Sequence, residues 1–306
     1  MNSRNKKDVI VVVHDAGGAE LVGAYIRKNQ GRCNWYIYGA GPARKIFRRL
    51  RLPLRSVADD PAQIAAIMKT HRDAAFALIA APGWMSKIEI RALASANKAG
   101  IRTVVYKDSW VDERRRFKKT LPKEFWVGDQ YALHDIREQF PHIPAMLVTN
   151  EYIAGDVRRY RSLRKALPKK RTILFLSDVR PESQTLLQAL LVVMAATEHP
   201  PHLLVRFHPA DVRTRYDGLI RTYDRSVHIH RSREKDVVRD LVRAHVVVGA
   251  ETAALALAVS CGIPTVSLVQ KKKRAMLPFK EILSTHDPQR AASHVLALVD
   301  SRTTGR

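Results

Sequence analysis

The chain alternates short apolar runs with longer stretches in which apolar residues recur every three to four positions. The short runs are rich in β-branched residues and predict strands, and the longer stretches predict amphipathic helices. In the first half, the predicted strands are Val9–Val13, Trp35–Tyr38, Ala75–Ala80, Arg102–Tyr106, Glu124–Val127 and Ala145–Val148. The helices expected between them are Ala19–Lys28, Pro42–Arg51, Pro61–His71, Lys87–Ala99 and Tyr131–Phe140.

The second half repeats this alternation after a polar, arginine-rich segment. Its predicted strands are Thr172–Leu176, Leu203–Phe207, Val227–His230, Val246–Val248 and Thr265–Val269, and its helices are Pro181–Glu198, Val212–Tyr223, Lys235–Arg243, Thr252–Ser260 and Pro288–Val299. We therefore expect an α/β protein with two Rossmann-like, doubly wound parallel-sheet domains facing a cleft, and ligands at the carboxyl ends of the strands. The expected bounds are 1–153, a linker over 154–170, and 171–306.

Length and composition agree with this organisation. The 306 residues are enough for two domains, and 46% of them are hydrophobic. The apolar stretch Leu186–Thr197 is too short to span a membrane, and Val9–Val13 is too short for a secretory signal. Cys33 and Cys261 are too few for a disulfide scaffold or a cysteine-rich zinc site. We therefore expect a soluble cytoplasmic protein.

The net charge of +24 adds an expectation about partners. A strongly cationic protein attracts polyanions such as anionic lipid, nucleic acid or phosphorylated small molecules. The basic clusters lie in both halves, for example at Arg48–Arg51, Arg114–Arg116 and Lys271–Arg274. No helix-turn-helix, zinc-finger or RNP-type pattern accompanies them, so we expect no specific nucleic-acid partner. A merely solvated cationic surface is the alternative.

Two motifs follow predicted strands of the first half. Strand Val9–Val13 ends in His14 and Asp15, which are candidates for a catalytic base, and Gly17 and Gly18 in the next turn would let a ligand approach the backbone. An ordinary strand–turn–helix junction is the alternative. Farther along, Asp108 and Trp110 precede three arginines, which suits sugar stacking and phosphate binding on the acceptor side. A solvated loop explains that pattern equally well.

Two further motifs lie in the second half. Arg206 and His208 follow an apolar strand and could donate hydrogen bonds to phosphate oxygens, although Arg206 could instead pair with a nearby carboxylate. The next motif begins at Gly249, where a strand runs into a small-residue helix whose free N–H groups could bind a diphosphate. Glu251 could bind ribose, or it and Thr252 could simply cap the helix. The expected donor set is Arg206, His208, Gly249, Ala250, Glu251, Thr252 and Ser177.

We expect neither a metal nor a cofactor. His228 and His230 are two residues apart on a predicted strand, but no third ligand occurs at a suitable spacing. The sequence also lacks GxSxG, P-loop and zinc-protease motifs.

Taken together, these motifs resemble known families. Arg206–Pro209 followed by Gly249–Pro264 resembles the nucleotide-sugar half of GT-B glycosyltransferases and of the related UDP-sugar epimerases. The first half resembles GT-B-type glycosyltransferase-like proteins of bacterial surface-polysaccharide and sialic-acid loci. That resemblance rests on the stretches His14–Glu20, Gly39–Ile46, Gly83–Glu89, Asp108–Phe117 and Phe125–Ala132. The family has Asp-His-Trp where this chain has Asp108-Ser109-Trp110.

The resemblance implies a glycosyltransferase that needs no metal. Its partners would be a nucleotide-sugar donor, a glycan or lipid-linked acceptor, and the anionic surface of the inner membrane, to which a cytoplasmic protein would attach peripherally. Asp15, with His14 beside it, would act as the base. One alternative is a nucleotide-sugar hydrolase or 2-epimerase of the same fold, and another is a non-catalytic polyanion-binding protein.

Overall fold

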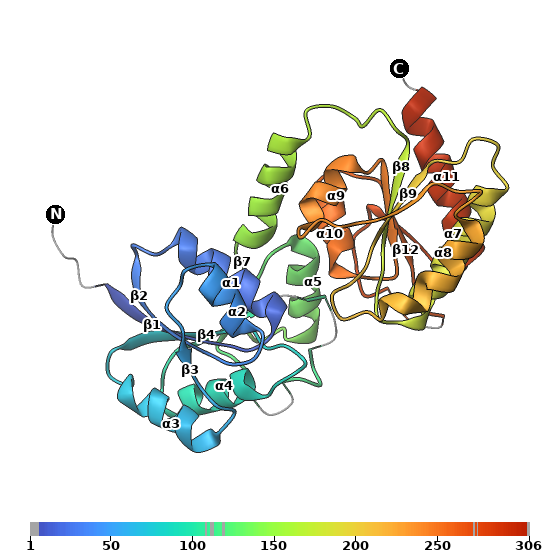
Figure 1. Ribbon diagram of the computed structural model, residues 1–306. Coiled ribbons are helices and arrows are strands. Elements are labelled where there is room, and N and C mark those ends of the chain that lie inside the picture. Colours follow the sequence, from blue (N-terminus) through green and yellow to red (C-terminus); the bar gives the residue numbers. More distant parts are fainter. Residues whose placement is uncertain are drawn as a thin grey trace. The chain divides into compact units, whose positions relative to one another are not determined.

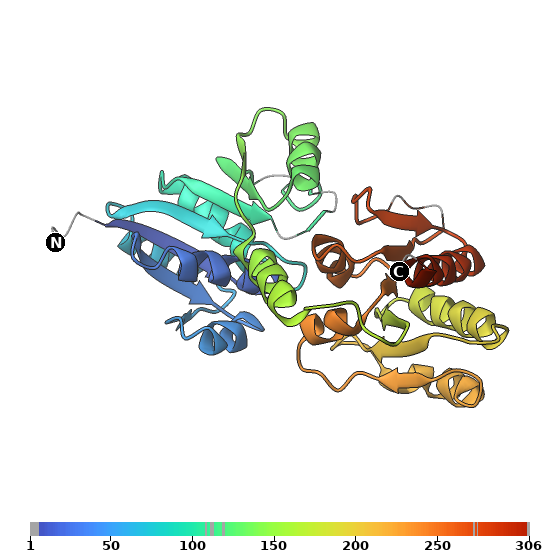
Figure 2. The same cartoon turned by 90° about the horizontal axis from the view of Figure 1, so that it is seen from above.

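The computed structural model describes residues 6–107, 109–110, 113–117, 120–271, 273 and 275–304 (Figure 1). The chain divides into two compact units, Met1–Ala154 and Gly155–Arg306. Helix α6 (Glu151–Leu163) contains the division and leads from one unit to the next, as Figure 2 shows. It occupies much of the segment for which the sequence suggested a linker. None of the described helices is long and apolar enough to cross a membrane.

The described part of the N-terminal unit contains a seven-stranded parallel sheet in the order β3-β2-β1-β4-β5-β6-β7. The strands are β1 (Lys7–Val13), β2 (Cys33–Gly39), β3 (Arg55–Ser56), β4 (Ala75–Ala80), β5 (Thr103–Lys107), β6 (Glu124–Val127) and β7 (Ala145–Leu147). The helices are α1 (Ala16–Lys28), α2 (Ala43–Arg49), α3 (Pro61–Thr70), α4 (Ile88–Lys98) and α5 (Gln130–Gln139).

Helices cover both faces of this sheet. Successive side chains of a strand point to opposite faces, so Val9, Val11 and Val13 pack with α1 and α2 on one face. Ile10 and Val12 pack with α3, α4 and α5 on the other face. The neighbouring strands β1 and β4 are therefore followed by helices on opposite faces. Their carboxyl ends form the topological switch point, where ligands bind in open α/β sheets.

The C-terminal unit has the same plan, with a six-stranded parallel sheet in its described residues, in the order β10-β9-β8-β11-β12-β13. The strands are β8 (Thr172–Leu176), β9 (His202–Arg206), β10 (Ile229–Arg231), β11 (Val246–Gly249), β12 (Thr265–Leu268) and β13 (Ile282–Thr285). The helices are α7 (Pro181–Ala195), α8 (Asp217–Tyr223) after a short 3-10 turn (Arg213–Tyr216), α9 (Val237–Arg243), α10 (Ala253–Ser260) and α11 (Pro288–Thr304).

The C-terminal switch point lies between β8 and β11. Ile173 and Phe175 of β8 pack into a core with α7, α8 and α11, and Figure 1 shows α9 and α10 on the other side of this sheet. Strand β8 is followed by α7 and its neighbour β11 by α10, so the connections diverge at this edge. The fold class predicted from the sequence, two Rossmann-like parallel-sheet domains, is confirmed. The cleft expected between them stays a prediction.

Candidate functional site

At the N-terminal switch point, Asp15 connects the loop after β1, in which it lies, to the loop after β4, about 70 residues farther along the chain. Its Oδ2 atom accepts hydrogen bonds from the backbone N–H groups of Trp84 (2.6 Å) and Met85 (3.1 Å), which follow β4. The carboxylate caps that loop and forms no side-chain bond to its own helix α1. A Cβ atom at Gly83 would overlap the carboxylate, so this approach requires glycine.

His14 is oriented by its neighbours. Its backbone N–H donates to buried Glu89 (2.7 Å), and its Nδ1 atom donates to Oδ1 of Asp15 (2.6 Å). Because an ionised carboxylate can only accept, we assign the ring proton to Nδ1, and Nε2 keeps its lone pair in the neutral ring. Nε2 lies at Gly41, which has a φ of +53° and no room for a side chain. A histidine base oriented by a carboxylate is a recurring catalytic arrangement.

The structure corrects the glycine turn predicted after β1. Gly17 and Gly18 lie in the first turn of α1, not in a turn before it. Gly18 packs against Ala81, where a Cβ atom would come within 2.6 Å of the carbonyl oxygen. Trp110 donates from Nε1 to Asp129 (2.8 Å) and packs on the core, while Asp108 lies outside the described residues.

A buried ion pair lies beside the loop that Asp15 caps, because Arg116 donates to the backbone oxygen of Pro82 in that loop. Glu113, only 1% exposed, accepts from Ser109 and pairs with Arg116 at 3.1 Å. Burial raises the pKa of Glu113, and the charge of Arg116 opposes this shift. Arg116 lies 4.0 Å from the ring centre of Trp84. Trp84 and its neighbour Met85 are 65% and 80% exposed, so this switch point presents an aromatic and an apolar surface to solvent.

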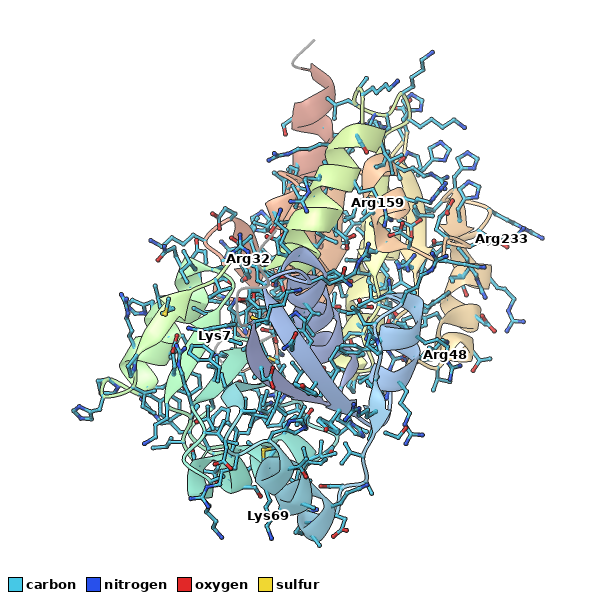
Figure 3. The ribbon with its side chains drawn as sticks, turned by 90° about the vertical axis from the view of Figure 1, so that its left-hand side faces the viewer. Lys7, Arg32, Arg48, Lys69, Arg159 and Arg233 are labelled. Atoms are coloured by element: carbon cyan, nitrogen blue, oxygen red, sulfur yellow. The ribbon has the colours of Figure 1, made fainter. Side chains whose placement is uncertain are left out.

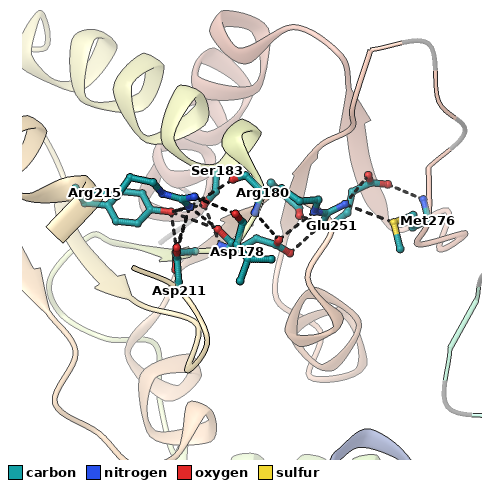
Figure 4. Close-up of polar contacts among 11 residues, drawn as sticks. Asp178, Arg180, Ser183, Asp211, Arg215, Glu251 and Met276 are labelled. Carbon is teal, nitrogen blue, oxygen red and sulfur yellow. Dashed lines mark hydrogen bonds and ion pairs between the residues drawn. The ribbon is translucent and has the colours of Figure 1, made fainter. Parts of the chain in front are cut away.

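At the C-terminal switch point, Arg180 connects three loops. Its guanidinium forms a two-atom contact with Asp178 after β8 (3.0 and 2.9 Å) and donates to the backbone oxygen of Ala250 after β11. It also reaches Glu251 (3.3 Å) and the Sδ atom of Met276 beyond β12 (3.4 Å). Figure 4 shows this arginine at the centre of the cluster. Burial opposes its charge, but Asp178 and Glu251 raise its pKa.

Glu251 adopts a strained backbone conformation at the same edge. Its φ is +56°, in the left-handed region that non-glycine residues rarely occupy, at a typical cost of about 1–3 kcal/mol. The buried carboxylate accepts from the backbone N–H of Met276 (2.5 Å) and from Arg180. Such strain tends to occur at functional sites.

A second group of polar residues supports the loop after β8. The carboxylate of Asp211 accepts from Ser177 (2.6 Å) and Tyr216 (2.8 Å) and pairs with Arg215 (3.0 Å). Because the single proton of the Tyr216 hydroxyl goes to Asp211, its oxygen accepts from the hydroxyl of Ser183 (3.0 Å) in the first turn of α7. Ser177 is buried, and these contacts already occupy its hydroxyl.

Arg206 and His208 have different surroundings. Arg206 pairs with fully buried Asp240 (2.7 Å) and donates to the backbone oxygen of Glu234 (3.0 Å). This pairing with a carboxylate is the alternative to phosphate binding that the sequence left open. The Nδ1 atom of His208 accepts from the N–H of Ala210 (3.2 Å), so its neutral ring carries the proton on Nε2. His208 therefore has a donor for a ligand, whereas the charge of Arg206 is already balanced.

The remaining predicted donor residues surround the start of α10. Gly249 ends β11, where a Cβ atom would come within 2.9 Å of the Leu176 oxygen. Ala250 is buried, and Thr252 is the N-cap residue without a side-chain cap. Across the described residues, no group of three or more His, Cys, Asp or Glu side chains could hold a metal ion.

Sequence reasoning missed Arg180 and Trp84. Arg180 directly precedes Pro181, the first residue of α7, so the signal was a cation at a predicted strand-to-helix junction. Trp84 lies within Gly83–Glu89, a stretch quoted for the resemblance, and its signal was an aromatic residue after a glycine at the end of a strand.

The sequence matches no protein-family model and no curated protein sequence. Several solved structures share the fold. The UDP-GlcNAc 2-epimerase of Neisseria meningitidis bound to UDP-GlcNAc has a TM-score of 0.72 at 10% identity, over 97% of this chain and 92% of that chain. HepE (Alr3699) of Anabaena in complex with UDP-glucose has a TM-score of 0.64 at 12% identity, over 96% and 90%.

MurG of Acinetobacter baumannii is also similar, with a TM-score of 0.62 at 13% identity over 95% of this chain and 83% of that chain. At these identities the likeness shows the fold. The chain has a GT-B-like fold of two Rossmann-like domains, and the resemblance indicated by the sequence motifs is confirmed at that level.

Proposed function

We propose that the chain is an enzyme that uses a nucleotide-sugar, and specifically a metal-independent glycosyltransferase. The observation that carries this proposal is the meeting of Arg180 and Glu251 at the C-terminal switch point, with the strained φ of Glu251. A cation and a buried acceptor at this edge suit a diphosphate and a ribose. Structures of the same fold hold UDP-GlcNAc and UDP-glucose, which supports this ligand class.

In this proposal the donor displaces the contact between Arg180 and Glu251. Arg180 and the Nε2–H of His208 donate to the diphosphate, because charged donors form strong hydrogen bonds with phosphate oxygens. Glu251 then accepts from ribose hydroxyls. The free N–H groups at the start of α10, after Thr252, add donors for the phosphate.

The proposed reaction begins with a proton transfer at His14. Nε2 takes the proton of an acceptor hydroxyl, and the hydroxyl oxygen attacks the anomeric carbon of the donor. The bond from that carbon to the phosphate oxygen breaks, and the electron pair leaves with the nucleoside diphosphate, whose charge Arg180 stabilises. Asp15 keeps His14 in the required tautomer. The exposed ring of Trp84 could stack against a sugar of a glycan or lipid-linked acceptor.

A nucleotide-sugar 2-epimerase or hydrolase is the second candidate. The observation in its favour is that the Neisseria meningitidis epimerase has a higher TM-score, 0.72, than the MurG and HepE structures. Incubation with a UDP-sugar alone distinguishes the reactions, because an epimer or free sugar then forms without an acceptor. Nucleotide binding without any turnover would favour the third candidate, a non-catalytic polyanion-binding protein.

We expect Arg180→Ala and His208→Ala each to weaken nucleotide-sugar binding. A hydrogen bond to a charged group contributes about 1.5–3 kcal/mol, so each change should lower the affinity roughly tenfold to over a hundredfold. Titration calorimetry with the nucleotide-sugar that binds the wild-type chain measures this effect.

The matched control is Arg225→Ala. Arg225 is an exposed cation in the loop before β10, at the opposite, amino end of the sheet. The Arg225→Ala variant removes the same charge as Arg180→Ala and should leave the affinity for the nucleotide-sugar within a few-fold of wild type. Equal affinities for Arg180→Ala, His208→Ala and the control would refute the donor site.

A further inference from the structure

The face of the N-terminal unit formed by α1 and α2 carries most of the unit's excess positive charge. Residues 16–51, which contain both helices, include eight lysines and arginines and a single acidic residue. Figure 3 looks toward this part of the chain and labels Arg32 and Arg48. The cations of α2 lie on its exposed side, because Ile46 and Phe47 fill the core beneath it.

Most of these cations have no ion-pair partner among the residues that the structure describes. Glu20 pairs with Arg49, whereas Arg27, Arg44, Lys45 and Arg48 form no ion pair with any carboxylate that the structure describes.

Several of these cations also oppose the stability of α2. Arg44 and Lys45 lie in its first turn, where the helix dipole disfavours positive charge. Arg44 and Arg48 are four residues apart, a spacing at which like charges repel. Arg44 and Lys45 therefore cost folding free energy, whereas Arg27 and Arg48 lie in the last turns of α1 and α2, where the helix dipole favours positive charge.

The opposite face of the same sheet is close to neutral. Residues 57–100, which contain α3 and α4, include five basic and four acidic residues. One of these acids, Asp59, pairs with Arg91 at 2.7 Å. The positive charge is therefore concentrated on one face and is not a uniform property of the N-terminal unit.

We propose that the α1–α2 face binds the anionic lipid surface of a membrane. Lipid phosphates lie in a plane, which suits a broad face of two helices packed side by side on a sheet. Single-stranded nucleic acid fits less well. All large apolar and aromatic side chains that are exposed in the described structure lie outside residues 16–51. The described α1–α2 face therefore has no exposed aromatic ring on which a base could stack. Attachment is then electrostatic and peripheral.

The test is sedimentation of the full chain with phosphatidylcholine vesicles, with or without phosphatidylglycerol. The first variant combines Arg27→Gln, Arg44→Gln, Lys45→Gln and Arg48→Gln. Each cation near an anionic surface contributes roughly a fivefold factor, so we expect the partition coefficient to fall by about several hundredfold. Raising the salt concentration should release the wild-type chain.

The matched control removes four exposed cations from the opposite face, by Lys69→Gln, Arg72→Gln, Lys98→Gln and Arg137→Gln. It should bind within a few-fold of wild type, with melting curves confirming that both variants fold. Equal losses of vesicle binding in the two variants would show that binding depends on the total charge of the chain and not on the α1–α2 face.

Two other results would also overturn the proposal. The first is equal binding to neutral vesicles, or no binding to anionic vesicles at low salt. The second is tighter binding to an RNA or DNA duplex, lost in the first variant, which would assign the α1–α2 face to nucleic acid.

Discussion

His14→Ala should lower the turnover number by about 10²–10⁴, which is the usual effect of removing a general base. Nucleotide-sugar affinity should stay within a few-fold of wild type, because the proposed donor contacts belong to the C-terminal unit. The measurement is kcat for product formation beside a titration with the donor. His134→Ala, at an exposed histidine of α5, is the matched control and should retain full activity.

Asp15→Asn tests how His14 is oriented. If the asparagine oxygen keeps the hydrogen bonds from Trp84 and Met85, its NH₂ group faces Nδ1 of His14. Nδ1 must then accept, the ring proton moves to Nε2, and the histidine can no longer act as a base. We therefore expect a fall in kcat of about the same size, roughly 10²–10⁴, with unchanged donor affinity.

The two variants together separate the possible outcomes. If His14→Ala loses activity and Asp15→Asn does not, His14 is the base and Asp15 is dispensable for its orientation. If both retain activity, the chemistry lies elsewhere, and Asp108 is the next candidate.

Arg206→Ala should destabilise the C-terminal unit more than it changes ligand affinity. Asp240 is fully buried, and its Oδ2 atom accepts from Arg206 and from the hydroxyl of Ser232, both at 2.7 Å. Removing one partner of a buried ion pair leaves an uncompensated charge, at a cost of about 3–5 kcal/mol. Chemical denaturation followed by circular dichroism measures this loss.

A compensating variant distinguishes charge from packing. Arg206→Met combined with Asp240→Leu removes both charges and should recover much of the lost stability, because an apolar pair often replaces a buried ion pair at little cost. If Arg206→Ala keeps wild-type stability and abolishes nucleotide binding, then Arg206 is a donor-site residue and this account of it is wrong.

Strands and switch points follow from the sequence because their signals are local. Strands such as Ala75–Ala80 and Thr172–Leu176 are continuous apolar or β-branched runs with the predicted bounds, and Glu124–Val127 also has the predicted bounds. The order of strands and helices then identifies the carboxyl ends at which His14, Asp15 and Glu251 lie. The strands β3 and β13 were missed, because β3 has only two residues and β13 buries only Ile282 and ends in polar residues.

The contacts within the sites could not be predicted in the same way. Arg180 and Glu251 are 71 residues apart, and only the pairing of β8 with β11 brings them together. Arg206 looked like a phosphate ligand because periodicity leaves open which face of β9 it occupies. The buried carboxylate of Asp240, 34 residues farther on, decides its role.

The central claim is that the unmodified chain binds a nucleotide-sugar, and a thermal-shift screen with UDP-, GDP-, CMP- and CDP-sugars tests it directly. A ligand at one hundred times its Kd adds about 2.7 kcal/mol to the free energy of unfolding, which raises the Tm by several degrees. We expect such a rise with at least one donor, and a much smaller rise in Arg180→Ala. An unchanged Tm with every nucleotide-sugar would contradict it.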